Sequence, residues 1–464
     1  MPVIRTWQLA AGATALGLAI AAGAVAAAGP WESGQREAER ERAVAKTGTE
    51  TDIDRKAPGP GRPAPAPSAP GVLDPLGGRP ASKAADAKPG ELGEKLRPLF
   101  DAPGLGPLRT ASVIDVSTGR RLYGEGADRA MPPASTIKIA TAAAALTALG
   151  PDHRIPTSVV AAEDRLTLVG GGDASLDAAG LRLLADRTAR ALKTRGLTSV
   201  QLRHDTSLYA GGPLHPIGRN GNIAPVTALM VDQGRIDADS TGYAERAHDP
   251  AGEAARAFAR MLERRGVRID GPPAPGHPAA GARPLAKVLS EPLAALAERM
   301  LTDSDNDLAE SLARQTALAL GEKADFAGGG RAVRAQLSRL RLPLAGARFA
   351  DGSGLDRKSR VSAGLLTALL ARAAEPARPE LRPVLTGLPV AGFTGTLRTR
   401  YEEGDPGSGL IRAKTGTLTG VNALSGTVAA PDGRLLAFAF LAGRTASRDE
   451  AQDALDALAG ALVS

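Results

Sequence analysis

The 464-residue sequence contains no cysteine, which excludes disulfides, thiolate metal sites and cysteine nucleophiles. Its five histidines are scattered, with no HExxH motif and no pair four residues apart, so they predict no metal site. Aromatic residues make up only 3% of the chain, and no block of lysine and arginine is interleaved with them. The composition therefore argues against binding of nucleic acid.

A strong excess of one charge is also lacking, because 57 basic residues stand against 50 acidic ones and the net charge is +7. The apolar content of 43% and the charged content of 23% are ordinary for a globular protein. The length suffices for two or three domains. The small basic excess fits a mixed, solvated surface, and weak attraction to anionic envelope polymers is the alternative.

Only the N-terminal end of the chain reads as a targeting segment. Arg5 precedes a run built mainly of alanine and glycine, from Leu9 to Ala28, which ends in an A-x-A pattern. We expect residues 1–28 to be an export signal that is cleaved after Ala28. The alternative is an uncleaved membrane anchor, although the run contains few strongly apolar residues. In either case we expect the rest of the chain on the extracellular or cell-wall side of the cytoplasmic membrane.

Residues 29–91 show no periodic apolar pattern, and six prolines fall between Ala57 and Pro70. We expect this stretch to be a disordered, semi-rigid linker. Beyond it the apolar spacing predicts regular structure. Helices are expected at 92–100, 176–196, 251–266, both ends of 291–313 and 447–462; strands at 154–160, 165–176, 199–209 and in succession over 411–443; and a hairpin over 110–126.

A serine and a lysine stand at the start of an alanine-rich run. Pro132 and Pro133 fix an extended entry, after which the alanines favour a helix. Ser135 then lies in the first helical turn, with Lys138 three residues on and on the same face. A partly desolvated lysine can take the proton of a neighbouring serine and make it a nucleophile. Alone this pattern is weak, because exposed serines and lysines are common on helices.

Two further short elements follow in the order that is typical of penicillin-binding proteins and class A β-lactamases. They are Ser304-Asp305-Asn306, between two predicted helices, and Lys414-Thr415-Gly416, on a predicted strand. Singly, the first is more often a helix cap or turn, and the second is more often an ordinary turn. All three elements in this order and in these contexts make a strong signal for acyl transfer.

The residue types suggest roles in such a reaction. Ser135 attacks the carbonyl carbon and Lys138 accepts its proton. Ser304 can relay a proton to the leaving amine. Asn306 offers an amide that orients both a substrate peptide group and Lys138.

The third element supplies binding groups. Lys414 brings positive charge toward a substrate carboxylate, with the hydroxyls of Thr415 and Thr417 beside it. The backbone N–H groups of Ser135 and Thr417 would form the oxyanion hole. Gly416 lets a substrate approach the edge of the strand closely.

Over residues 92–464 the chain resembles the class C low-molecular-mass penicillin-binding proteins, the D-Ala-D-Ala carboxypeptidase/endopeptidase family S13. The stretches that carry the resemblance, besides the three elements, are LTLVGGGDASL, NIAPVTALMVD, MLTDSDNDLAESLAR, FADGSGLDRKSRVS, LPVAGFTGTLRTR and RAKTGTLTGVNALSG. The resemblance implies an α/β (α+β) serine β-lactamase/transpeptidase-like fold, in which a five-stranded antiparallel sheet is flanked by helices.

The resemblance also implies an inserted domain between the first two elements. Ser304 follows Ser135 by 169 positions, which is ample for one insert. We expect a catalytic domain made of residues 92–156 and 284–464, and an inserted domain over 157–283. The insert looks shorter than in members with two nested inserts, so the innermost one is expected to be missing.

The activity that the resemblance implies is hydrolysis of the terminal D-Ala-D-Ala bond of peptidoglycan stem peptides, with endopeptidase action on cross-links as an extension. β-Lactams are the expected covalent inhibitors, and no metal or cofactor is implied. Membrane contact is expected only through an uncleaved N-terminal segment.

Two other functions remain open. A serine β-lactamase would use the same residues, but no E-x-x-L-N motif lies between Asn306 and Lys414. A catalytically silent β-lactam-sensing or wall-binding module would normally lack one of the catalytic side chains, and all are present here.

The loop from Asp351 to Leu355 has two interpretations as well, either lining the site through its glycines or forming a tight turn stabilised by Asp351.

Overall fold

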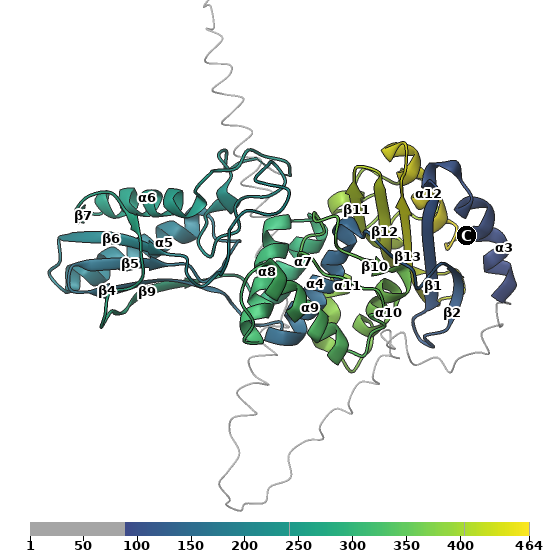
Figure 1. The fold of residues 1–464 in the computed structure, drawn as a ribbon, viewed down its shortest axis with the longest axis horizontal. Coiled ribbons are helices and arrows are strands. Elements are labelled where there is room, and N and C mark those ends of the chain that lie inside the picture. Colours follow the sequence, from purple (N-terminus) through teal and green to yellow (C-terminus); the bar gives the residue numbers. More distant parts are fainter. Residues whose placement is uncertain (1–88, 241, 403, 464) are drawn as a thin grey trace, which may run out of the picture. The chain divides into compact units, whose positions relative to one another are not determined.

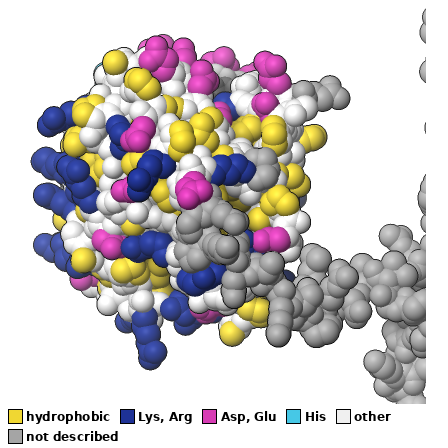
Figure 2. Space-filling model, turned by 90° about the vertical axis from the view of Figure 1, so that its right-hand side faces the viewer, with side chains coloured by type: hydrophobic (Ala, Val, Ile, Leu, Met, Phe, Trp, Pro, Cys, Tyr) yellow, Lys and Arg dark blue, Asp and Glu magenta, His cyan; other side chains and the backbone are white. Residues whose placement is uncertain are grey.

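The computed structural model describes residues 89–240, 242–402 and 404–463 (Figure 1). The predicted export signal, and the predicted linker as far as residue 88, lie outside these ranges. Within them, no helix is both long enough and apolar enough to cross a bilayer. On the face that Figure 2 shows, basic and acidic side chains are interspersed with apolar ones.

A five-stranded antiparallel sheet forms the centre of the catalytic part, as predicted (Figure 1). Its strand order is β11-β12-β13-β1-β2, so the two ends of the described chain meet in one sheet. The bounds are β1 Leu108–Asp115, β2 Arg121–Glu125, β11 Ile411–Leu418, β12 Val421–Ala429 and β13 Leu435–Gly443. The hairpin expected over 110–126 is confirmed by the antiparallel pairing of β1 with β2.

Both faces of this sheet are covered, because the side chains of a strand alternate between its two faces. On β13, Phe438 and Phe440 pack into one apolar cluster with residues of α3 (Pro89–Phe100) and α12 (Arg448–Gly460). Ala437 and Ala439 pack into a second cluster on the other face, with residues of α4 and α10 (Ala363–Ala373). The sheet is therefore the middle of three layers.

The helix that follows Ser135 is central to the second cluster. Helix α4 (Lys138–Leu149) is rich in alanine, and its side chains from Ile139 to Leu146 are all buried. Small side chains let neighbouring helices approach closely, and α4 packs against α7 (Leu293–Thr302), α8 (Asn306–Ala319) and α9 (Phe326–Arg339). It ends at Gly150, whose φ of +84° suits glycine and whose N–H donates to Leu146 O.

A second sheet lies in the stretch for which an inserted domain is expected (Figure 1). It consists of β4 Pro156–Ala162, β5 Arg165–Val169, β6 Ser199–Asp205, β7 Arg268–Ile269, β8 Ala274–Pro275 and β9 Arg283–Leu289. Helices α5 (Ala178–Thr194) and α6 (Pro250–Glu263) share an apolar cluster with it, separate from the two clusters of the catalytic part. Antiparallel pairing of β4 with β9 brings the two chain connections side by side. The exact domain boundaries stay a prediction.

The remaining short elements connect these layers. They are β3 Ala130–Met131, β10 Val361–Ser362, α11 Arg382–Thr386 and five 3₁₀ turns, η1 Pro103–Leu105, η2 Ala134–Ile137, η3 Asp232–Gly234, η4 Pro379–Leu381 and η5 Gly395–Leu397.

Several predicted boundaries differ from the structure for identifiable reasons. The first helix begins at Pro89 instead of residue 92, since the fixed φ of proline suits a first helical turn. The strand expected to reach residue 176 ends at Val169, before three glycines. At Gly171 the backbone passes so close to Pro156 that a Cβ atom would lie 1.8 Å from Pro156 O. Only glycine fits there, and the strand ends before this contact. Helix α5 starts only at Ala178, where the Asp177 carboxylate caps it.

Candidate active site

The turn that carries Ser135 is tightly packed. Ser135 lies in the 3₁₀ turn η2, and α4 begins at Lys138. Ala134 has a φ of +47°, a strained conformation for alanine. Two glycines pack against this turn where a larger residue would clash. A Cβ atom on Gly354 would lie 2.0 Å from Ala134 O, and one on Gly416 would lie 2.7 Å from Pro133 O. Gly416 thus lets β11 approach the nucleophile's own turn, besides the predicted approach of substrate.

Lys138 lies at the centre of the site, and its side chain is fully buried. Its Nζ is 2.9 Å from Ser135 Oγ, 2.7 Å from Asn306 Oδ1 and 2.8 Å from Ser353 O. The amide and peptide oxygens can only accept hydrogen bonds, so a neutral amine donates its two protons to them. Its lone pair is then left for the third partner, the hydroxyl of Ser135. The three contacts are compatible with the predicted role of Lys138 as the base for Ser135.

The environment of Lys138 raises the fraction of this neutral form. Burial lowers the pKa of its side chain to about 8, although the carboxylates of Asp351, Asp305, Glu310 and Asp307 act in the opposite direction. A base whose pKa lies near the working pH combines a useful neutral fraction with good proton affinity.

The second element stands at the start of α8. Asp305 caps the helix by accepting a hydrogen bond from Leu308 N at 2.9 Å, so the interpretation as a cap is also correct. Asn306 is the first helical residue, and its Nδ2 donates to Asn222 O of the insert at 3.0 Å. Ser304 precedes them with a φ of +59°. Its hydroxyl has no hydrogen-bond partner among the described residues, so its relay role stays a prediction.

The third element lies on β11, as predicted. Lys414 is fully buried, and its Nζ donates to Thr415 O at 3.0 Å. Within the described ranges it forms no ion pair. Burial lowers the pKa of Lys414 well below its usual value, and the charge of Lys138 adds to this effect, while Asp303 opposes it. A buried lysine with one hydrogen-bond acceptor would be stabilised in its charged form by an anionic ligand, which suits the predicted carboxylate site.

The two threonines flank Lys414 differently. Thr415 is buried, and its Oγ1 donates to Thr396 Oγ1 at 2.7 Å. Thr417 is exposed, and Gln452 Nε2 donates to its hydroxyl at 3.4 Å. The structure thus joins Ser135, Lys138 and Asn306 by hydrogen bonds, whereas the oxyanion role of Thr417 stays a prediction.

The loop from Asp351 to Leu355 does line the site, through the Ser353 carbonyl that accepts from Lys138. It is also a tight turn, because Asp351 Oδ2 accepts from Asp356 N at 2.7 Å. Both interpretations of this loop are therefore correct. A backbone carbonyl leaves no mark of its own in a sequence, and the glycines around it were the only signal.

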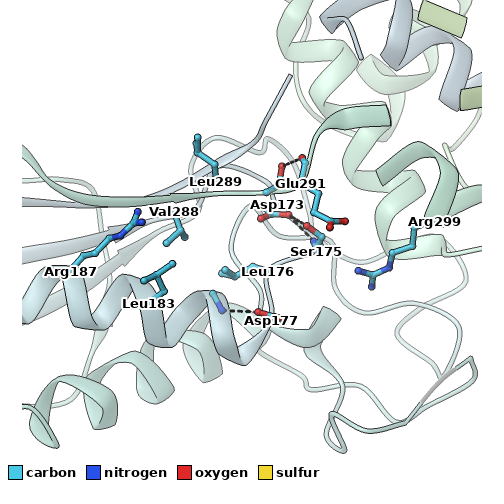
Figure 3. Close-up of a pocket in the computed structure, with 12 residues that line it drawn as sticks. Asp173, Ser175, Leu176, Asp177, Leu183, Arg187, Val288, Leu289, Glu291 and Arg299 are labelled. Carbon is cyan, nitrogen blue, oxygen red and sulfur yellow. Dashed lines mark hydrogen bonds between the residues drawn. The ribbon is translucent and has the colours of Figure 1, made fainter. Parts of the chain in front are cut away.

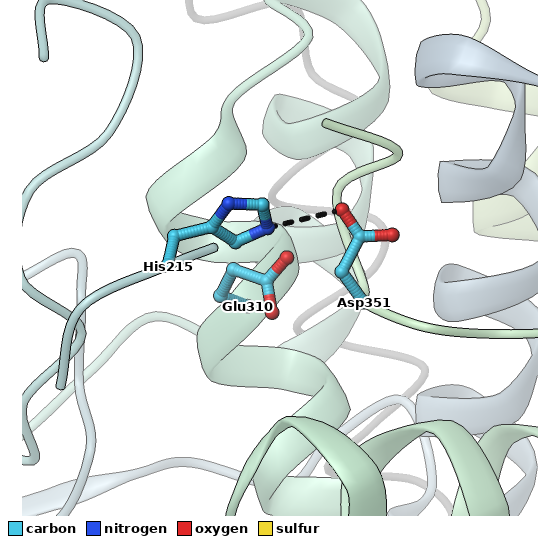
Figure 4. Close-up of side chains that lie close together, drawn as sticks. All are labelled: His215, Glu310 and Asp351. Atoms are coloured by element: carbon cyan, nitrogen blue, oxygen red, sulfur yellow. Dashed lines mark hydrogen bonds and ion pairs between the residues drawn. The ribbon is translucent and has the colours of Figure 1, made fainter. Parts of the chain in front are cut away.

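Three buried side chains behind this loop come close enough together to raise the question of a metal. One ligand atom each of His215, Glu310 and Asp351 lies within 4.8 Å of the others (Figure 4). However, Glu310 Oε1 already accepts from the backbone N–H groups of Gly352 and Ser353, at 3.0 and 2.9 Å. The cluster is therefore a satisfied hydrogen-bond network.

A separate open pocket of about 560 Å³ lies between α5, β9 and the loop after β5 (Figure 3). Asp173, Glu291 and Arg299 are among the residues that line it. Burial raises the pKa of Asp173, which accepts two hydrogen bonds from Ser175. None of the predicted site residues lines this pocket, whereas Ser135, Lys138 and Asn306 lie together around Lys138 Nζ.

Comparison with known proteins identifies the family. The model of the D-Ala-D-Ala carboxypeptidase 3 (S13) family matches residues 94–245 and 237–462. Carboxypeptidase DacB of Mycolicibacterium smegmatis is 37% identical over 382 residues, which cover 78% of this chain and 81% of that protein. The D-alanyl-D-alanine carboxypeptidase of an Actinomadura species is 28% identical over 447 residues, covering 78% and 82%.

Solved structures share the fold. Penicillin-binding protein 4 (dacB) of Haemophilus influenzae matches with a TM-score of 0.67 and 21% identity, covering 79% of this chain and 98% of that one. The same protein in complex with a novel β-lactam matches with a TM-score of 0.65 and 20% identity, covering 81% and 100%. The chain belongs to the S13 family of D-Ala-D-Ala carboxypeptidases. The predicted class of enzyme, a serine-type D-Ala-D-Ala carboxypeptidase, is confirmed.

The state of Lys138 predicts a pH dependence. Only the neutral amine can take the proton of Ser135, and its fraction grows as the pH rises toward about 8. The rate constant for acylation by a labelled penicillin should therefore fall about tenfold per pH unit below that value and level off above it. Stopped-flow measurements from pH 5.5 to 9.5 test this. Lys138→Arg should give no acylation at any pH, and a flat profile for the unchanged protein would contradict the assignment.

Proposed function

We propose that the chain cleaves the terminal D-Ala-D-Ala bond of peptidoglycan stem peptides through an acyl-enzyme on Ser135, and that β-lactams acylate the same oxygen. The observation that carries this proposal is the set of three contacts of Lys138 Nζ, which leaves its lone pair for the Ser135 hydroxyl. The relatives named as D-alanyl-D-alanine carboxypeptidases, and the β-lactam complex of the Haemophilus protein, support the substrate and the inhibitor.

The proposed reaction has two halves. Ser135 Oγ attacks the carbonyl carbon of the penultimate D-Ala while its proton passes to Lys138 Nζ. The carbonyl oxygen becomes an anion that accepts hydrogen bonds from the N–H groups of Ser135 and Thr417. The C–N bond then breaks, and the amine of the terminal D-Ala leaves with a proton delivered through Ser304. Water attacks the ester in the second half and restores the hydroxyl of Ser135.

Cleavage of cross-links would follow the same steps with a longer leaving group. Incubation with a D-Ala-D-Ala pentapeptide and with a cross-linked muropeptide, followed by identification of the products, separates carboxypeptidase from endopeptidase action.

The β-lactamase alternative receives no support from the one buried glutamate near the base. Glu310 is fully buried, and its Oε1 accepts two backbone hydrogen bonds from Gly352 and Ser353. It therefore holds a loop and is not free to activate a water on the acyl-enzyme. The silent-module alternative is disfavoured by the contact between Lys138 and Ser135.

Export to the extracellular or cell-wall side is part of this proposal, since the substrate lies there. Its support is the pattern of residues 1–28. Fractionation of cells and N-terminal sequencing of the mature protein distinguish a cleaved signal, with Gly29 first, from a retained anchor.

The first test concerns the nucleophile. A labelled penicillin should attach covalently, and peptide mapping should place it on Ser135, because Lys138 Nζ lies 2.9 Å from that hydroxyl alone. Ser135→Ala should abolish the labelling, whereas Ser175→Ala, at the separate pocket, should leave it unchanged. Labelling that persists in Ser135→Ala would rule out the assignment.

The second test concerns Lys414. If its buried charge binds the terminal carboxylate, Lys414→Ala should lower kcat/KM on peptides with a free carboxylate more than on amidated forms, by at least about tenfold. Peptide hydrolysis is measured on both forms in parallel. Equal losses on the two substrates would mean that Lys414 serves the fold or the proton transfer instead.

The third test separates peptidase from β-lactamase. A β-lactam's leaving amine stays tethered and blocks the approach of water, and the buried Glu310 already accepts two backbone hydrogen bonds. Penicillin consumption should show a stoichiometric burst and then stall for minutes to hours, against about 10 turnovers per second for a typical enzyme. Sustained turnover at such rates would overturn the peptidase assignment.

A further inference from the structure

The position of the base depends on a loop that has no regular structure. Lys138 Nζ is held by Asn306 Oδ1, at the start of a helix, and by Ser353 O, in the loop that follows Asp351. The first acceptor belongs to a side chain at the start of α8, and its amide is oriented by the hydrogen bond from Asn306 Nδ2 to Asn222 O. The second acceptor is fixed only by the side chains that hold the loop in place.

Two buried carboxylates hold this loop. Glu310 accepts from Gly352 N and Ser353 N, so it fixes the peptide groups on either side of residue 352. Asp351 accepts from Ser353 Oγ at 3.1 Å and from Ser359 Oγ at 2.7 Å. Burial acts to raise the pKa of Asp351, but its hydrogen bonds outweigh this and lower it, so the carboxylate stays charged.

One further hydrogen bond to Asp351 comes from the inserted stretch. His215 Nε2 lies 3.2 Å from Asp351 Oδ2, and both side chains are fully buried (Figure 4). His215 Nδ1 accepts a hydrogen bond from Ile217 N at 3.3 Å. An imidazole whose Nδ1 accepts carries its proton on Nε2, so His215 donates to Asp351. Phe326 of α9 packs edge-on against the ring, with the centroids 5.2 Å apart.

The same stretch of the insert reaches the other acceptor of Lys138. Asn222 O accepts from Asn306 Nδ2. Arg246 forms a buried ion pair with Asp307, the next residue of α8, at 2.9 Å. Residues between 215 and 246 therefore contact both structures that hold the amine.

We propose that His215 is a positioning residue for the base: through Asp351 it fixes the loop whose Ser353 carbonyl aligns Lys138 Nζ with Ser135. This inference rests on the proposed acyl-enzyme function and assigns a task to the insert within it. Small displacements of reacting groups are costly, since about 1 Å can lower a rate a hundredfold. Loss of the His215 contact should therefore slow acylation and leave the initial binding of the β-lactam intact.

The test compares two substitutions of His215 by residues with amide side chains, each of which reproduces one of the two ring nitrogens. His215→Asn retains an acceptor near the position of Nδ1 but is too short to reach Asp351. His215→Gln places an N–H donor near the position of Nε2. His277→Gln is the matched control, because His277 also belongs to the insert and lies 3.6 Å from a carboxylate, Asp205, but its side chain is 77% exposed.

Acylation by a labelled penicillin is followed by stopped flow over a range of concentrations, which separates the limiting rate constant from the half-saturating concentration. Thermal melting reports folding. We expect His215→Asn to lower the limiting rate constant at least about tenfold, while its half-saturating concentration stays within about twofold of that of the unchanged protein. The limiting rate constants of His215→Gln and His277→Gln should stay within about threefold of that of the unchanged protein. EDTA should have no effect on any variant.

An unchanged rate constant in folded His215→Asn would overturn the inference. So would equal losses in the Asn and Gln variants, or loss of acylation in EDTA that zinc restores. If His215→Asn does not fold, Ser359→Ala removes another hydrogen bond to Asp351 and must show the same selective loss. Failure of the unchanged protein to label on Ser135 would instead contradict the proposed function itself, so the two outcomes can be told apart.

Discussion

The active site depends on one amine that is buried without an ion-pair partner. An ammonium transferred from water into a protein interior loses hydration that only a counter-charge or several hydrogen bonds can offset. Among the described residues, Lys138 Nζ has hydrogen bonds to three oxygens and no ion pair. Burial lowers the pKa of Lys138 to about 8, which raises the fraction of the neutral amine that the proposed role toward Ser135 requires. The alanine-rich α4, the glycines around its first turn and the Ser353 loop all serve to bury and orient this group.

The second buried lysine explains how substrate and base are connected. Burial lowers the pKa of Lys414, and the charge of Lys138 lowers it further, since like charges that lie close together repel. A substrate carboxylate beside Lys414 would supply a negative charge next to this amine. Such a ligand would favour the charged form of Lys414, while the lone pair of Lys138 would stay directed at Ser135. Substrate binding and base chemistry would then be divided between two similar side chains.

Sequence alone predicted the layers and the principal motifs, because these depend on local patterns. The side chains of β13 alternate between the two faces of the sheet, and the alanine-rich run after Ser135 forms a buried helix. Both features can be read from the order of residues along the chain. The contacts of Ser353 and His215 could not be predicted, for different physical reasons. The first is made by a backbone carbonyl, which every residue has. The second joins two irregular loops 136 positions apart, and no periodicity links them. The domain boundaries and the oxyanion hole remain predictions.

The inserted stretch cannot be regarded only as an appendage to the catalytic sheet. It has its own apolar cluster, yet it buries Arg246 against Asp307 and His215 against Asp351. The contact of Arg246 with Asp307 is a buried ion pair, and such a pair contributes little net stability because the desolvation of both charges offsets their attraction, but removing one partner costs about 3–5 kcal/mol. The contact of His215 with Asp351 is a buried hydrogen bond to a carboxylate. Such contacts therefore specify position more than they add stability. Here they join the insert to α8 and to the Asp351 loop, and these two segments carry Asn306 Oδ1 and Ser353 O, which both accept from Lys138 Nζ.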